Sequence, residues 1–397
     1  MPSVVFIFGA GASWDFGAPL MREFMERAET FAGNPRMGCA LAKVKAWRSQ
    51  AISRGALRNY ADNPGDKPAP DANNLEDMMC LLDIGGYLFD AADAGVMAAL
   101  QHLAAECYFL ATADELNRTL HELTTQGTEP SSGYAKLVRA LRALEDGILW
   151  NKRCSFITFN YDVALDAVLA RTPAHSFGGL PDGAGFNETD PERVEIARAA
   201  SWPLYWLGRA NDFELQYRIP RLLKLHGSLN WGTCAEPDCD APIRQFRFFD
   251  TIGAAGLSAI DPVHEMAKKP CGYHLSNDGT TRKHKPYIIP PTWKRASLRY
   301  ALRRVWTQAC QDISEATRIV IVGHSLPPTD TYFRYVLARA LTSGAEKRVL
   351  VVNPNERDSD RYKEFLSSLL PDGSLAMHPA RFSDSVDRIE EFVAEIL

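Results

Sequence analysis

The amino-acid sequence predicts an α/β fold: a Rossmann-like parallel sheet covered by helices, with a large helical insertion and a small irregular module. Short apolar runs recur along the chain, and each is followed by polar residues and then by apolar residues at helical spacing. Repeats of this unit are typical of a parallel sheet with helices on both faces. Between the first two runs the chain is rich in Leu, Ala, Met and Glu at helical spacing, which predicts the insertion.

Composition places the chain among ordinary globular proteins. Apolar residues make up 46% of its 397 residues, charged residues make up 23%, and the net charge is −5. Nucleic-acid-binding domains usually have a basic excess, so direct nucleic-acid binding is not expected. No apolar run approaches the roughly 18 residues of a membrane span, and no basic segment precedes the first apolar run as in a secretion signal. Eight cysteines over this length fit a reducing compartment and predict a cytoplasmic protein.

The first unit of the predicted sheet carries a candidate phosphate-binding turn. The strand expected at Val4–Phe8 is followed directly by Gly9-Ala10-Gly11-Ala12-Ser13, and helical spacing begins near Leu20. A strand that breaks at glycines before a helix brings backbone N–H groups to where a diphosphate can bind. The dehydrogenase pattern needs a third glycine, where Trp14 stands, and a strand ending in an acidic residue about 20 positions later, which is not found. An ordinary strand–turn–helix without a ligand is the alternative.

The later units follow the same pattern. The further expected strands are 154–159, 222–225, 287–289, 318–323 and 349–352. The expected helices are 20–30, 41–52, 162–169, 296–313, 330–341, 361–370 and 385–396, together with several in the region 75–150. Polar clusters follow five of the strands, at 9–13, 160–162, 226–228, 323–325 and 353–355. Ligands of doubly wound sheets bind outside the carboxyl ends of the strands, so these clusters are expected to converge.

These elements divide the chain into a core and two inserted parts. The core is expected to comprise residues 1–32 and 151–397, the helical insertion residues 33–150, and the small irregular module residues 232–286. Residues 62–74 and 175–191 are rich in turn-forming residues and are expected to be loops.

Each polar cluster also has an ordinary structural explanation. Asn160 fits a turn, and Asp162 and Ser325 fit helix caps. A histidine that follows a strand, such as His226, is more often structural than catalytic. The order and spread of the clusters are therefore more informative than any single one.

Together, the clusters resemble the ordered motifs of the sirtuin family, and they look most like its divergent bacterial branch of NAD hydrolases used in anti-phage defence. The matching stretches are Gly9-Ala10-Gly11-Ala12-Ser13 with Ala18-Pro19, Thr158-Phe159-Asn160-Tyr161-Asp162, Lys224-Leu225-His226-Gly227-Ser228-Leu229-Asn230-Trp231, Gly323-His324-Ser325-Leu326 and Val352-Asn353. They span nearly the whole chain, but the shared core does not explain the helical region.

The resemblance implies a role for individual residues. Asn160 would bind the nicotinamide-side ribose and place a water near its anomeric carbon, Asp162 would support that ribose or the loop, and His226 would be the general base. The implied NAD+-binding residues are Gly9, Ala10, Gly11, Ala12, Ser13, Arg22, Gly323, His324, Ser325 and Asn353. Nicotinamide is a cationic leaving group, so an amide that orients water and an imidazole that accepts a proton suit its release.

One departure from the family pattern bears on the reaction. Sirtuin deacylases continue the glycine turn with Gly-Ile-Pro-Asp-Phe-Arg, whereas this chain has Gly17-Ala18-Pro19-Leu20-Met21-Arg22. The arginine is kept, but the aspartate and the phenylalanine are replaced by Leu20 and Met21. The phenylalanine shields the reaction centre in deacylases, so its loss disfavours protein deacylation. Hydrolysis to ADP-ribose and nicotinamide, or cyclisation, is favoured instead.

The small module contains a candidate structural zinc site. Sirtuins carry a zinc module after the catalytic histidine, and here Cys234, Cys239, Cys271 and His274 supply three thiolates and an imidazole. The alternative is unpaired cysteines in an irregular segment. Four protein ligands would leave no position open for substrate, so a bound zinc would be structural.

The resulting hypothesis is a regulated NAD+ hydrolase that depletes NAD+ in anti-phage defence. Control is expected through assembly as a homo-oligomer, with the helical region as a contact surface. The resemblance also implies a possible partner protein such as an ATPase or another phage-sensing component. A non-catalytic sensor of NAD or ADP-ribose derivatives would not need His226, and it remains the alternative from another functional class.

Overall fold

The structure is a computed structural model. It describes residues 3–59, 70–88, 94–125, 128–144, 154–171, 221–234, 243–246, 249–252, 256–275, 281–289, 300–327, 330–344, 346–394 and 396. The loop expected at 175–191 lies outside these residues, as does most of the loop expected at 62–74.

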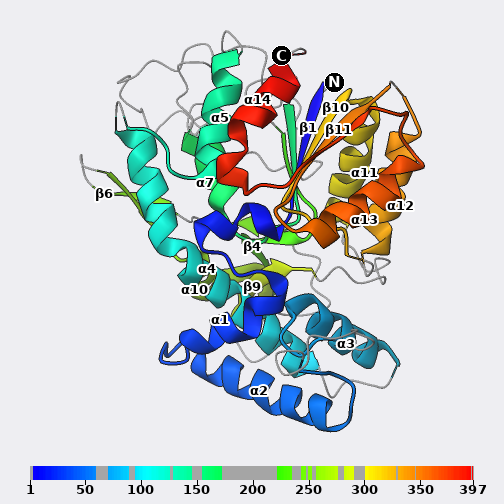
Figure 1. Ribbon diagram of the computed structural model, residues 1–397. Coiled ribbons are helices and arrows are strands. Elements are labelled where there is room, and N and C mark those ends of the chain that lie inside the picture. The colour runs from blue at the N-terminus through cyan, green and yellow to red at the C-terminus, as the bar shows by residue number, and fades with distance from the viewer. Residues whose placement is uncertain are drawn as a thin grey trace.

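A parallel sheet forms the centre of the protein, as predicted, and it has six strands (Figure 1). The strand expected at 287–289 is not among them, because residues 287 and 288 end an antiparallel strand of a second sheet. Its strands are β1 (Val4–Phe8), β2 (Cys154–Thr158), β3 (Arg221–Lys224), β10 (Arg318–Val322), β11 (Arg348–Val352) and β12 (Leu375–His378). Their order across the sheet is β12-β11-β10-β1-β2-β3, and all neighbours pair in parallel. Every residue of β1 and β2 is buried, because helices cover both faces. The edge strand β12 was not predicted, since it is short and only half-buried.

Helices flank the sheet on two sides in Figure 1. One group is α11 (Tyr300–Glu315), α12 (Thr331–Leu341) and α13 (Glu356–Ser367), and the other is α5 (Gly133–Leu144), α7 (Ala164–Arg171) and α14 (Val386–Ala394). The α5 helix falls within the segment predicted as the insertion, yet it packs on the sheet, with the ring centroid of Tyr134 5.3 Å from that of Phe8. The α13 helix begins earlier than predicted, because the Asn355 side chain caps it by accepting the N–H groups of Arg357 and Asp358.

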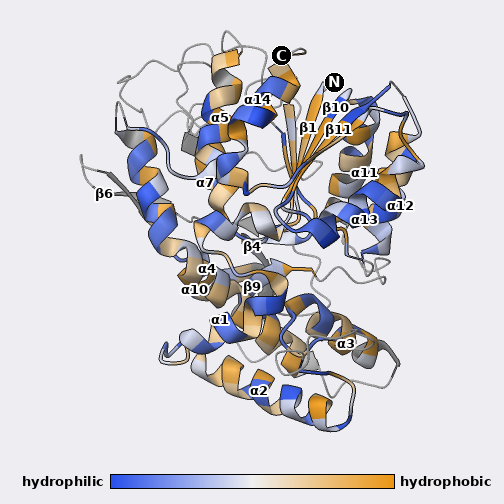
Figure 2. Cartoon of the chain, in the orientation of Figure 1, coloured by the Kyte–Doolittle hydropathy of each residue, from blue (hydrophilic) through white to orange (hydrophobic). Residues whose placement is uncertain are grey.

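A helical region extends away from the sheet, as predicted. It consists of α1 (Phe24–Thr30), α2 (Gly38–Ser53), α3 (Leu75–Leu88) and α4 (Ala94–Thr124), with α4 running from beside the sheet to the other helices (Figure 1). Apolar and polar residues alternate along α2 (Figure 2), and its buried residues include Leu41 and Val44. The α4 helix is the longest of these four helices, with 31 residues. In the described part of the chain, no helix combines the length and hydrophobicity that crossing a membrane requires.

The segment 232–286 was expected to be an irregular module, but its described residues form regular strands and a helix. A four-stranded antiparallel sheet of order β5-β4-β9-β8 and a hairpin of β6 and β7 lie there. The elements are β4 (Gly227–Cys234), β5 (Arg244–Gln245), β6 (Phe249–Ile252), β7 (Gly256–Ala259), α10 (Pro262–Lys268), β8 (Pro270–Leu275) and β9 (Thr281–Ile288). The central pairing joins β4 to the distant β9, and register shifts interrupt both the β4–β9 and the β8–β9 pairing, so the strands leave little local pattern.

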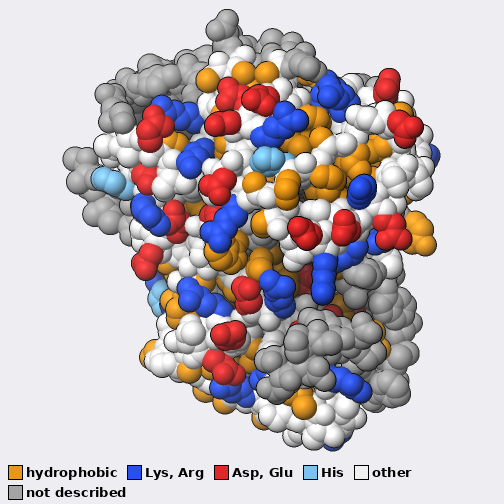
Figure 3. All heavy atoms as spheres, in the orientation of Figure 1, with side chains coloured by type: hydrophobic (Ala, Val, Ile, Leu, Met, Phe, Trp, Pro, Cys, Tyr) orange, Lys and Arg blue, Asp and Glu red, His pale blue; other side chains and the backbone are white. Residues whose placement is uncertain are grey.

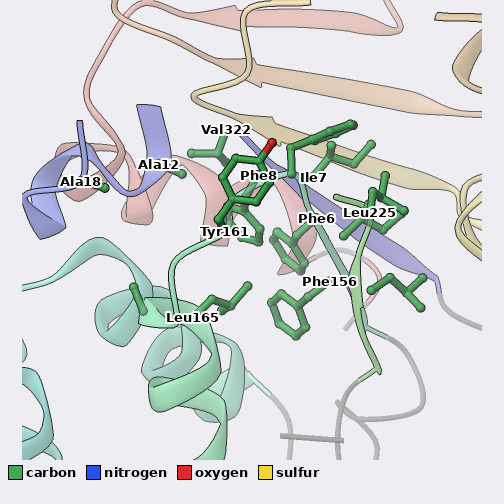
Figure 4. Packing of buried hydrophobic residues seen from close by; sticks show 14 of the residues in the cluster. Phe6, Ile7, Phe8, Ala12, Ala18, Phe156, Tyr161, Leu165, Leu225 and Val322 are labelled. Carbon is green, nitrogen blue, oxygen red and sulfur yellow. The ribbon is translucent and has the colours of Figure 1, made fainter. Parts of the chain in front are cut away.

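The core of the parallel sheet is built from aromatic side chains of neighbouring strands. Phe6 stacks on Phe156 with ring centroids 5.2 Å apart, and Phe8 and Phe156 are also stacked. Figure 4 shows these rings with Tyr161 and Leu165 at the end of the sheet that bears the polar clusters. Lys and Arg side chains are interspersed with Asp and Glu on the face shown in Figure 3, which fits the small net charge.

Candidate functional site

The strand order places the reversal of the sheet between β1 and β10. The chain moves from β1 to β2 and β3 on one side, and then returns to β10, β11 and β12 on the other. This is the order of doubly wound dinucleotide-binding sheets, in which the ligand lies outside the carboxyl ends of the strands at the reversal. The two polar clusters nearest this point, at 9–13 and 323–325, follow β1 and β10. The geometry therefore defines a candidate dinucleotide site at this edge.

The two loops at the reversal are in direct backbone contact. The Gly11 N–H donates to the Gly323 carbonyl at 2.8 Å. A Cβ on Gly9 would lie 2.5 Å from the Cα of His324, and one on Gly323 would lie 2.3 Å from the Ala12 nitrogen. Gly323 also has a φ of +60°. The glycines are thus required for the approach of the two loops, whether or not a ligand binds.

The turn after β1 leaves one backbone donor available. It forms a 3₁₀ turn in which the N–H groups of Gly9, Gly11, Ala12 and Ser13 donate to carbonyls. Among the described residues, the Ala10 N–H has no partner. The diphosphate contact predicted for this turn can therefore use the backbone N–H of Ala10, whereas the other four N–H groups of the turn already donate to carbonyls.

Asn160 follows β2 and is 5% exposed. Its amide nitrogen donates to the Gly9 carbonyl at 2.9 Å and also lies 2.9 Å from the Ser13 hydroxyl. The Gly9 carbonyl can only accept a hydrogen bond, so the side-chain atom of Asn160 that faces it must be the amide nitrogen. The other terminal atom of the Asn160 side chain is therefore the oxygen. The Asn160 amide oxygen is buried and has no hydrogen-bond partner in the described part of the chain. The protein thus holds the donor end of the amide, while the acceptor end is buried without a partner among the described residues.

Tyr134 is a site residue that the sequence analysis missed. It lies at the start of α5, is fully buried, and its hydroxyl is 3.0 Å from the Ser13 hydroxyl and 3.2 Å from the Asn160 nitrogen. Burial raises the pKa of Tyr134 well above its usual value, so the phenol stays protonated. No local sequence motif identifies this tyrosine as a site residue. Its hydroxyl, the polar group at the start of the apolar face of α5, was only a weak indication.

Asp162 supports the loop that carries Asn160. Its carboxylate accepts the Ala164 N–H at 3.0 Å, at the start of α7. The ammonium of Lys224 donates to the Asp162 carbonyl and pairs with Asp166 at 3.0 Å, and both charged side chains are buried. This ion pair fastens the loop after β2 to β3. These contacts hold the loop after β2 in place, and the role expected for Asp162 stays a prediction.

His226 lies between β3 and β4 and is 3% exposed. Its ring is 5.1 Å from Phe159 in an edge contact and 6.1 Å from Trp306. Phe159 and Tyr161, which flank Asn160 in the sequence, both contact this imidazole. The structure thus brings the loops of Asn160 and His226 to the ends of neighbouring strands, with His226 set among aromatic rings.

His324 follows β10 in the loop that meets the glycine turn. Its Nδ1 accepts the Leu326 N–H at 3.1 Å and lies 2.6 Å from the Tyr362 hydroxyl, which donates to it. Nδ1 therefore carries no proton, and the neutral ring is protonated at Nε2. Burial, and secondarily the charge of Arg361, lowers the pKa of His324 to about 3.

The buried neutral His324 predicts a pH dependence of stability. Between pH 6.5 and about 3 the unfolded chain binds a proton at this position that the folded chain does not, so stability falls as pH falls. The slope contributed is at most about 1.4 kcal/mol per pH unit. His324→Asn keeps an acceptor and removes the titration, so its free energy of unfolding should fall less steeply.

Urea unfolding of both proteins between about pH 6.5 and pH 4.5 tests this expectation. The buried carboxyl groups of Glu76 and Glu106, whose pKa values burial raises to about 8 and about 7, act in the opposite direction in both proteins. Parallel slopes for the two proteins would contradict the assignment of a neutral His324.

The loop after β11 is held to the loop after β10. The Asn353 amide donates to the His324 carbonyl at 3.2 Å and accepts the Asn355 N–H at 3.0 Å. Burial raises the pKa of Asp358, while Arg361, Asn353 and Arg22 act in the opposite direction. The guanidinium of the exposed Arg22 lies 3.9 Å from the carboxylate of Glu23. Arg361 donates to the Ser325 carbonyl, while the half-buried Ser325 hydroxyl has no partner among the described residues.

Comparison with known proteins returns structures but no sequence family. No family model and no curated protein matches the chain. A mutant Sir2 homologue in complex with ADP-ribose is 13% identical, with a TM-score of 0.39 and coverage of 99% of this chain and 92% of that chain. A Sir2 complex with a p53 peptide and NAD+ is 11% identical, with a TM-score of 0.39 and coverage of 98% and 92%. Similarity at this level assigns no ligand or activity to this chain.

Half of the predicted zinc ligands are neighbours. Cys234 at the end of β4 and Cys271 in β8 are buried together. Cys239 and the side chain of His274 lie outside the described residues. Within the described part of the chain, no three His, Cys, Asp or Glu side chains are grouped to hold a metal. The structural zinc site stays a prediction.

Proposed function

We propose that the protein is a sirtuin-like NAD+ hydrolase that releases nicotinamide and forms ADP-ribose or a cyclic product. The observation that carries the proposal is the Asn160 amide, whose nitrogen is held while its buried oxygen has no partner among the described residues. A buried acceptor without a partner costs about 1–3 kcal/mol, which favours a water or a ligand hydroxyl there. This acceptor is located at the edge where doubly wound sheets bind dinucleotides.

The proposed chemistry uses one oriented water. The bond between ribose C1′ and the nicotinamide nitrogen breaks, and its electron pair stays with nicotinamide, which leaves uncharged. The water oxygen bonds to C1′ and releases a proton. Asn160 is proposed to orient this water by accepting one of its hydrogens, and His226 to accept the released proton.

The proposed diphosphate site lies between the loops after β1 and β10. Ala10 offers a backbone N–H, Ser325 offers a hydroxyl, and the exposed Arg22 supplies a positive charge. These three groups suit an anion because each donates hydrogen bonds. The Ser13 hydroxyl is committed to Tyr134 and Asn160, so we propose that it acts on the ligand through Asn160.

Incubation of the purified protein with NAD+, with nicotinamide release followed by chromatography, tests the proposal. Release by the wild type, and its loss in His226→Ala, would support hydrolysis or cyclisation, and the ratio of the two products identifies which occurs. An acyl-lysine peptide in a parallel reaction tests deacylation, which Leu20 and Met21 disfavour. Peptide-dependent turnover alone would contradict the proposal.

Tyr134→Phe tests the support of the Asn160 amide. It removes one hydroxyl and keeps the ring that packs on Phe8. We expect kcat to fall about tenfold with KM nearly unchanged, because Asn160 loses orientation rather than a ligand contact. The free energy of unfolding should fall by only about 1 kcal/mol, measured by urea unfolding. An unchanged kcat in Tyr134→Phe would show that Ser13 and Gly9 suffice.

A non-catalytic sensor of NAD+ or ADP-ribose is the second candidate. The observation that favours it is the burial of His226 among Phe159 and Trp306, which restricts access of a reacting water to the imidazole. Tight binding of ADP-ribose without nicotinamide release, under all conditions and with any partner present, would support the sensor.

The wider setting of the activity is also a proposal. An NAD+-depleting enzyme needs control, and we propose control by homo-oligomerisation through the helical region, with a possible partner such as an ATPase or another phage-sensing protein. Light scattering of the protein alone and with NAD+ tests self-assembly. A monomer that is fully active at all concentrations would exclude this form of control.

A further inference from the structure

A large aromatic side chain is exposed directly beside the glycine turn. Trp14 follows Ser13 and is 41% exposed, whereas the apolar residues around it are buried. The guanidinium of Arg381 lies over its ring, 4.5 Å from the centroid. An arginine on one face of an indole leaves the rest of the ring available for a second planar group.

The path of the chain places this pair at the edge of the sheet that bears the site. After β12 ends at His378, whose carbonyl accepts the Asn353 N–H at 3.1 Å, the chain returns toward β1. It reaches β1 at Phe382, whose ring is 5.7 Å from that of Phe8, the last residue of β1. The Ser383 N–H then donates to Asp15 at 3.2 Å. Residues 379–384 therefore run beside the ends of β11 and β10, and Arg381 meets Trp14 there.

We propose that Trp14, backed by Arg381, is the stacking surface for the adenine base of the dinucleotide. This inference rests on the proposed function and deepens it, because it says what recognises the nucleoside half of the substrate. Aromatic side chains stack on any base through its π face. The Arg381 charge also favours the electron-rich base and the nearby diphosphate. Stacking of this kind needs no hydrogen-bonding pattern, so it would tolerate other purines.

Ligands with and without adenine test the proposal. Calorimetric titration of ADP-ribose should show an affinity about 10- to 100-fold weaker for Trp14→Ala than for the wild type, and close to wild type for Trp14→Phe. Cleavage of nicotinamide mononucleotide, which has no adenine, should have the same kcat/KM in all three proteins. Tyr335→Ala, which removes a 76% exposed aromatic ring on α12, is the matched control and should bind ADP-ribose normally.

The outcomes separate this inference from the proposed function. Equal affinity of wild type and Trp14→Ala for ADP-ribose would overturn the stacking surface and leave the hydrolase proposal standing. The proposal would also be overturned if Trp14→Ala lowered kcat/KM for nicotinamide mononucleotide as much as it lowered the affinity for ADP-ribose. The tryptophan would then act through the conformation of the turn and not by stacking on adenine. Failure of the wild type both to bind ADP-ribose and to release nicotinamide would instead overturn the proposed function. Melting temperatures of all variants verify that each is folded.

Discussion

Asn160→Ala is expected to lower kcat for nicotinamide release by about 10²- to 10³-fold. The substitution removes the amide oxygen that is proposed to orient the attacking water, while the glycine turn and His226 remain. The substitution also removes the amide N–H groups that donate to the Gly9 carbonyl and the Ser13 hydroxyl. The free energy of unfolding should fall by only about 1–2 kcal/mol, since a water in the space left by the amide can hydrogen-bond to both groups. Steady-state kinetics of nicotinamide release, with circular dichroism of the folded variant, measures both effects.

Asn117→Ala is the matched control for this prediction. Asn117 is an asparagine of α4 whose side chain accepts one backbone N–H, that of Ala259 at 2.7 Å, and it lies outside the proposed site. The same chemical change there should leave kcat at the wild-type value. Comparable activity of Asn160→Ala and Asn117→Ala would show that the amide oxygen has no part in turnover.

Gly323→Ala is expected to lower the free energy of unfolding by more than about 4 kcal/mol, or to prevent folding. Two costs add at this position. A non-glycine residue at φ +60° costs about 1–2 kcal/mol, and the new Cβ would lie 2.3 Å from the backbone nitrogen of Ala12. Relief of that contact would require the loops after β1 and β10 to separate, which would also disrupt the candidate site. Urea unfolding measures the loss of stability.

Two other glycines separate these costs. Gly373 has a φ of +81° with no atom within 4 Å of the position that a Cβ would take, so Gly373→Ala should cost only about 1–2 kcal/mol. Gly33 has neither a positive φ nor a close neighbour, and Gly33→Ala should be nearly neutral. If Gly323→Ala costs no more than Gly373→Ala, the loops are not in the tight contact described here.

Much of the core could be predicted from the sequence, since its signals are local. The strands β1, β2, β10 and β11 are mostly apolar, because both faces of the sheet are covered, and their bounds were predicted to within a residue or two. The antiparallel module was missed for the opposite reason. Its central strands β4 and β9 lie far apart in the sequence, and register shifts interrupt the β4–β9 and β8–β9 pairings, so their periodicity carries little information.

The candidate site was predicted in part. Placing Asn160, His226 and Gly323 at strand ends needed only the pattern of an apolar strand followed by polar residues. The role of Tyr134 could not be predicted, because its hydroxyl reaches Asn160 through packing of α5 on the sheet. The pairing of Lys224 with Asp166 likewise joins residues that are adjacent only after β2 and β3 align.

By itself, the sequence determined which residues form the buried strands and which polar groups follow them, because burial and turn formation depend on neighbours along the chain. Only the tertiary structure decided that β1 lies between β2 and β10, that the Asn160 amide turns its oxygen away from Gly9, and that Arg381 covers Trp14. The physical reason is that these features arise from contacts between distant segments, and they exist only once the sheet has assembled.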